Sequence, residues 1–140
     1  MTGRAPAWVR VVAALLALQA FLIGGWALVS PTSWFGWLPG FGIYWGQALG
    51  RYDPILVSDV GGLYIGFAFA LGIAAWHGSR GALIPVLAGW VVFSLVHLVS
   101  HLAHFTMPGS LDMLSTGALA LVLFAAAATV HRLLRGQPAA

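Results

Sequence analysis

Four long apolar stretches limit what this 140-residue chain can fold into more than any other feature of its sequence. They run over about residues 8–29, 54–76, 82–105 and 111–134. A helix of roughly 20 apolar residues crosses the hydrocarbon core of a bilayer, which is about 30 Å thick. The sequence therefore predicts an all-α membrane protein: a single domain over residues 1–140, with four transmembrane helices in an antiparallel bundle.

The composition excludes the main soluble classes of protein. Only 6% of the residues are charged and 61% are apolar, whereas soluble domains are about 25% charged. A soluble enzyme, a nucleic-acid binder and a disordered segment are therefore excluded. The absence of Cys excludes disulfides and thiolate metal sites, and the absence of Lys excludes a retinal or pyridoxal Schiff base.

Turn-forming and capping residues mark the ends of the predicted spans. Asp53 is a good N-cap, and Pro54 suits the first position of the second helix. Ser110 is the predicted N-cap of the fourth helix, and the carboxylate of Asp112 favours its positive end. Residues 30–53 are rich in aromatic side chains, glycine and proline, so we expect this segment to lie in the outer membrane interface.

Polar side chains form a stripe along one face of the third span. At 100° per residue they fall within an arc of about 80°. The stripe consists of Trp90, Ser94, His97, His101 and His104. Asp59 on the second span and Asp112 on the fourth enter the membrane from the same side. Ionisable groups are costly in hydrocarbon, so these three histidines and two aspartates form the predicted functional site.

The spacing of His97 and His101 is that of two metal ligands one helical turn apart, which suits zinc, copper or iron. A carboxylate from Asp59 or Asp112 would complete a set of two histidines and one carboxylate. Two other interpretations stay open. The same groups are also suited to a purely structural polar network between helices, or to a path for protons or lipid.

A stripe of small residues accompanies the aspartate of the second span. Asp59 shares one helix face with Gly62, Gly66 and Ala70. Because small residues allow a close helix contact, we expect this face to meet the bundle and to turn Asp59 away from lipid.

Several enzyme classes are excluded by their missing motifs, although the sequence leaves open whether the chain is an enzyme. Residues 97–101 read His-Leu-Val-Ser-His and lack the glutamate base of the zinc-protease motif. The intramembrane histidines all lie on one helix, whereas a haem with two His ligands takes them from different helices. A haem would therefore be bound only if it were shared with a second subunit.

The segment over residues 58–66, which reads Ser-Asp-Val-Gly-Gly-Leu-Tyr-Ile-Gly, resembles small four-helix bacterial membrane proteins of the DoxX-like group. The Gly24–Pro31 stretch adds to the likeness. More closely, the chain looks like an actinobacterial branch with an Asp-Val-Gly start to the second span and a His-x-x-x-His in the third. The positions that match are Asp59, Gly62, His97 and His101. The resemblance implies a membrane subunit of a redox complex, sometimes linked to quinone.

These observations predict a small integral protein of the cell (inner) membrane with an outward-facing His/Asp site. That site binds a transition metal or serves a redox complex; the alternatives are a structural or interaction module, or a small lipid or proton conduit. The expected partners are the lipid bilayer and either further copies of the chain or other subunits of a membrane complex, and no nucleic acid.

The arginines predict the orientation of the chain. If the N-terminus is cytoplasmic, five of the six arginines face the cytoplasm and only Arg51 faces out. Tags at both termini should then be protected from external reagents, and a Gly42→Cys variant should react with an impermeant thiol reagent added outside. An externally accessible C-terminus would reverse the orientation and move the His/Asp site to the cytoplasmic side.

Overall fold

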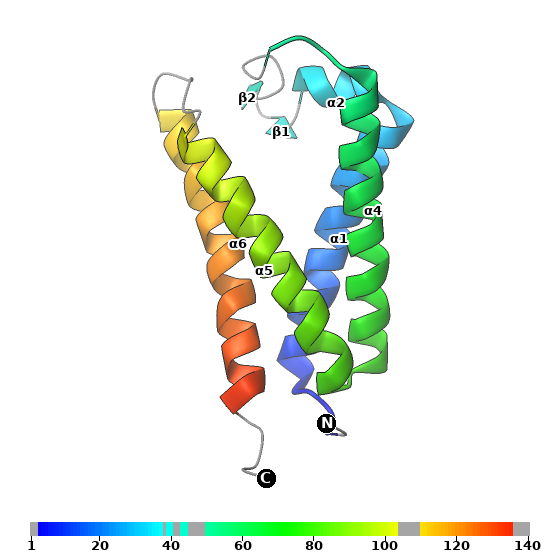
Figure 1. The fold of residues 1–140 in the computed structure, drawn as a ribbon, viewed down its shortest axis with the longest axis vertical. Coiled ribbons are helices and arrows are strands. Elements are labelled where there is room, and N and C mark those ends of the chain that lie inside the picture. The colour runs from blue at the N-terminus through cyan, green and yellow to red at the C-terminus, as the bar shows by residue number, and fades with distance from the viewer. Residues whose placement is uncertain (1–2, 38, 41–42, 45–49, 104–109, 136–140) are drawn as a thin grey trace. The chain divides into compact units, whose positions relative to one another are not determined.

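The structure is a computed structural model that describes residues 3–37, 39–40, 43–44, 50–103 and 110–135, with the backbone alone described at 39–40, 43–44 and 110–115. In these ranges the helices are α1 (Ala7–Val29), α2 (Pro31–Trp37), α4 (Pro54–His77), α5 (Arg80–Ala103) and α6 (Ser110–Arg135) (Figure 1). Two short strands, β1 (Pro39–Gly40) and β2 (Ile43–Tyr44), pair in an antiparallel manner.

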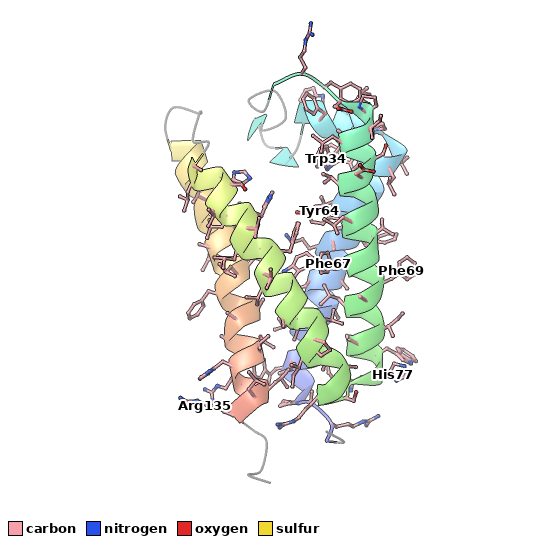
Figure 2. The ribbon with its side chains drawn as sticks, viewed as in Figure 1. Trp34, Tyr64, Phe67, Phe69, His77 and Arg135 are labelled. Atoms are coloured by element: carbon pink, nitrogen blue, oxygen red, sulfur yellow. The ribbon has the colours of Figure 1, made fainter. Side chains whose placement is uncertain are left out.

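Four helices of the described chain, α1, α4, α5 and α6, are long and apolar enough to cross a membrane. The 23 residues of α1 extend about 34 Å at 1.5 Å per residue, enough for a hydrocarbon core of about 30 Å. Large apolar side chains are exposed along these helices; Phe69 of α4, for example, is 62% exposed and projects from α4 on a different side from Tyr64 (Figure 2). The predicted all-α membrane fold with four spans is confirmed.

The contacts of the chain divide it into two compact units, which we describe separately. The first unit contains residues 1–15 and 70–140, and the second contains residues 16–69. Helices α1 and α4 pass from one unit into the other. The single domain over residues 1–140 stays a prediction.

The first unit holds the best-packed part of the core. Helices α5 and α6 lie side by side in antiparallel orientation (Figure 1). Among the side chains that the structure describes, the seven largest fully buried ones all belong to this unit and come from each of its four long helices. They are Val9, Leu71, Leu83, Leu87, Trp90, Thr129 and Leu133.

Two arginines of the first unit bond the carbonyl ends of neighbouring helices. The Nε of Arg10 on α1 donates to the carbonyl oxygen of Ala75 near the end of α4, at 2.9 Å. A terminal nitrogen of Arg80 on α5 donates to the carbonyl oxygen of Leu133 near the end of α6, at 3.2 Å. The last carbonyls of a helix have no partner within it, so these bonds both cap the helices and join them in antiparallel pairs.

The turn from α4 to α5 is fixed by a glycine and by the N-terminal segment. Gly78 has a φ of 67°, the left-handed conformation that commonly ends a helix. Its carbonyl oxygen accepts a hydrogen bond of 2.8 Å from the backbone N–H of Ala5, and the N–H of Arg80 donates to Gly3 at 3.2 Å. Two backbone hydrogen bonds to the N-terminal segment therefore stabilise this turn.

In the second unit, α1 and α4 approach so closely that their backbones meet. A Cβ built at Gly24 would lie 2.8 Å from the carbonyl oxygen of Gly61 and 3.0 Å from the backbone nitrogen of Ile65. On the facing helix, a Cβ at Gly61 would meet the side chains of Leu28 and Ala27. Gly24 and Gly61 therefore make the close helix contact of this unit.

The predicted stripe of small residues does not make the contact with α1, and the expectation that its face meets the bundle stays a prediction. A Cβ at Gly62 or at Gly66 would have no described heavy atom within 4 Å. Asp59, on the same face, is exposed. Gly61 and Gly62 are neighbours in sequence but 100° apart around the helix, and the structure uses the face of Gly61.

The helix starts follow the capping residues. The Oδ1 of Asp53 accepts hydrogen bonds from the backbone N–H groups of Ile55 (2.9 Å) and Leu56 (3.2 Å), which confirms the predicted N-cap of α4. Helix α5 begins at Arg80, two residues before the predicted position, because Ser79 caps it. The Oγ of Ser79 accepts from the N–H of Ala82 at 3.3 Å.

The aromatic segment after α1 begins with an ordered helix. The indole N–H of Trp26 on α1 donates to the Oγ of Ser33 on α2 at 3.1 Å, which ties α2 to the end of α1. The rings of Phe35 and Tyr52 meet edge to face with centroids 5.4 Å apart. The segment expected at the membrane interface thus has internal structure of its own.

Gly24 offers a sharp test of the α1–α4 contact. Gly24→Ala places a methyl group against the backbone of α4, and overpacking of this kind costs about 1–3 kcal/mol. Gly25→Ala is the matched control, because a Cβ there has nothing described within 4 Å and alanine is the better helix former. We expect thermal unfolding in detergent at a lower temperature for Gly24→Ala only. Equal melting temperatures for the two variants would contradict the contact.

The N-cap of α4 provides a second stability test. Asp53→Ala removes the acceptor for two backbone N–H groups and should lower the free energy of unfolding by about 1 kcal/mol. Asp53→Asn keeps a side-chain oxygen at the cap and should retain most of that stability. Reversible unfolding in mixed micelles measures both; an equal loss in the two variants would assign the effect to charge rather than to capping.

Candidate functional site

His97 and His101 lie next to each other on α5, one helical turn apart. Their ring centroids are 4.8 Å apart, and the ring planes make an angle of 73°. On the other side of His97, the ring of Phe93 is stacked at 5.7 Å with an interplanar angle of 11°. The three rings form a continuous row along the helix, which fixes the orientation of the first imidazole.

The row continues the buried face of α5. Trp90 is 2% exposed and Ser94 is 4% exposed, and both belong to the predicted polar stripe. His97 and His101 follow at helical spacing and are half-buried. The residues that share the stripe therefore share the packed side of α5, as their spacing predicts.

The structure brings together two of the five predicted site residues. His104 lies outside the described residues, and Asp112 is in the first turn of α6 with its side chain not described. Asp59 belongs to the second unit, where its carboxylate is exposed. In the described part of the chain, no group of three or more His, Cys, Asp or Glu side chains is placed to hold a metal ion.

The pair is nevertheless suited to two-point binding of a metal. A Zn–N bond is about 2.0–2.1 Å, so two nitrogens on one ion lie at most about 4 Å apart. Ring centroids 4.8 Å apart leave the two rings close enough for one nitrogen of each to be within this limit. Two nitrogen ligands are half of a tetrahedral set, so a complete site needs further donors.

The remaining two histidines lie at helix ends and are separate from this pair. His77 is the last residue of α4 and its side chain is exposed (Figure 2). His131 is in the last turns of α6 and is also exposed. Neither belongs to the polar stripe of α5.

Two residues contribute to the architecture of the first unit in ways that the sequence did not predict. Phe93 precedes His97 by four residues, so its spacing alone could have indicated the stacked rings. Arg10 was counted only as a cytoplasmic charge, whereas it bonds the end of α4. The signal for that role was its position: an arginine lies one turn inside an otherwise apolar helix.

Comparison with known protein families found no match for this chain, and comparisons with curated proteins and with solved structures found none either. The resemblance to the DoxX-like group therefore has no support beyond the residues that suggested it. The class that the fold establishes is a small multi-pass membrane protein with four candidate spans.

Proposed function

We propose that this membrane protein binds a transition metal ion through His97 and His101. The observation that carries the proposal is the placement of two half-buried imidazoles 4.8 Å apart on one face of an apolar helix. Polar side chains are expensive within a membrane and tend to mark functional sites. Imidazole pairs at this spacing suit zinc, copper and iron.

Further ligands must come from outside this pair. His104 follows His101 by three residues, and Asp112 lies in the first turn of α6, after a connection of six residues from α5 to α6. The short connection favours both as additional donors. Asp59 is the third proposed donor, because an exposed carboxylate on an apolar helix is costly until it has a partner.

The orientation and the partners of the protein are also proposed. The clustering of arginines favours cytoplasmic termini, which would place the histidine pair toward the outside. The likeness to DoxX-like proteins favours a role as a subunit of a redox or quinone-linked membrane complex, with copies of the chain or other subunits as partners. A haem would require a histidine from a second subunit.

The second candidate function is a structural one, in which the histidines only hold helices together. The half-buried position of His97 and His101 on the packed side of α5 favours it, because polar groups placed there can contact a neighbouring helix. Interhelical hydrogen bonds in membranes contribute about 0.6 kcal/mol on average and at most about 1.7 kcal/mol. This candidate therefore predicts a small loss of stability and no effect on metal content when a histidine is removed.

Metal analysis of two histidine variants separates the candidates. After expression in medium supplemented with zinc, copper and iron, the purified protein should carry one stoichiometric metal, and His101→Ala should lose it while staying folded. His131→Ala is the matched control, because its exposed histidine lies at the far end of α6, and it should retain the metal. Binding should weaken at low pH, because protons compete with the metal for imidazole nitrogen.

A wild-type protein without metal, combined with a His101→Ala variant that is only slightly less stable, would reject the metal site and leave the structural candidate. Loss of metal in both variants would show that the bound ion is not held by the α5 pair.

A further inference from the structure

An open groove of about 400 Å³ lies along α1 and α4 in the first unit. Small residues of both helices form its floor, among them Ala14 of α1 and Gly72 of α4. Val11 and Trp76 also line it, and both are largely exposed, Trp76 by 84%. The groove is open, and apart from Arg10 its lining is apolar and includes the indole of Trp76.

Arg10 supplies the only charge in the lining of this groove. Its guanidinium has five N–H donors. One bonds the carbonyl of Ala75 at 2.9 Å and a second reaches that of Trp76 at 3.5 Å. The other three have no hydrogen-bond partner in the described part of the chain, so the guanidinium is held in place with donors still available.

The charge of the first unit as a whole favours an anion. The first unit contains five of the six arginines, and its only acidic residue is Asp112. Asp112 lies in the first turn of α6, whereas Arg132 and Arg135 lie in its last turn, about 30 Å away along the helix. The positive charges of Arg132 and Arg135 at the end of α6 therefore have no carboxylate side chain close to them in the sequence.

We propose that this groove binds an anionic phospholipid, with its phosphate on the free N–H groups of Arg10 and one acyl chain along the floor. A guanidinium is suited to two parallel hydrogen bonds with a phosphate. The floor continues from Arg10 toward Ala14, into the apolar part of α1, which is the direction an acyl chain must take. Trp76 lies at the end of α4, where an indole favours the headgroup region. The lipid site is separate from the histidine pair and does not rest on its function.

Lipid titration of the full chain in detergent tests the proposal. Dioleoyl phosphatidylglycerol and dioleoyl phosphatidylcholine have the same acyl chains and differ in charge, and native mass spectrometry counts the molecules bound. We expect the anionic lipid to bind at least about tenfold more tightly. Arg10→Gln should remove that preference, because hydrogen bonds to charged groups contribute this much or more. Arg135→Gln makes the same charge change away from the groove and should bind as the wild type does.

A second variant keeps the proposal testable if Arg10→Gln fails to fold, since Arg10 also bonds the end of α4. Ala14→Leu fills the floor from an exposed position and should weaken binding of the anionic lipid severalfold, whereas Ala125→Leu, at an exposed position of α6, should not. Equal affinity of the wild type for the two lipids would overturn the proposal. Unchanged binding by Ala14→Leu would overturn it as well, whatever Arg10→Gln does.

Discussion

The hydrogen bonds from arginine to the carbonyl ends of helices are the interactions on which the first unit depends. A backbone carbonyl without a partner costs several kcal/mol where water is scarce, so a spanning helix must end with its carbonyls bonded. Arg10 bonds the end of α4 and Arg80 bonds the end of α6. Each donor comes from a neighbouring helix. A single arginine side chain therefore caps the C-terminal end of one helix and also joins that helix to an antiparallel neighbour. The arginines that predict topology are thus also structural groups.

Packing between α1 and α4 in the second unit depends on glycine residues, which leave the backbone open to close contact. Van der Waals contact, rather than a hydrophobic force, holds helices together in lipid, and small residues make that contact closest. Gly24 and Gly61 provide it in the second unit, where a single added methyl group would meet backbone atoms. In the first unit, large side chains such as Trp90 and Leu87 fill the core instead. Helices α1 and α4 of the second unit therefore meet through glycines, whereas large buried side chains fill the space between the helices of the first unit.

Local features of the sequence predicted the fold well, because span length and capping depend on neighbouring residues. The N-cap at Asp53 and the shared face of His97 and His101 are of this kind. Periodicity shows which residues share a face, but it does not show which face meets another helix. For that reason the stripe with Gly62 was chosen where the structure uses Gly61. The bond from Arg10 to Ala75 joins positions 65 residues apart, and no local pattern encodes such a contact.

The ionisable side chains of α5 are of two kinds: an arginine at its start and a pair of histidines near its end. Arg80 at its start bonds a helix end, which accounts for its charge in structural terms. His97 follows 17 residues later, about 26 Å along the helix, far beyond the reach of the arginine side chain. The rings of His97 and His101 contact each other at that depth, with centroids 4.8 Å apart. Two imidazoles on the packed side of one span are uncommon in a chain with so few ionisable residues, and this is the observation on which the proposed metal site rests. Arg80 and the histidine pair are therefore too far apart along α5 for a substitution at one to act directly on the other.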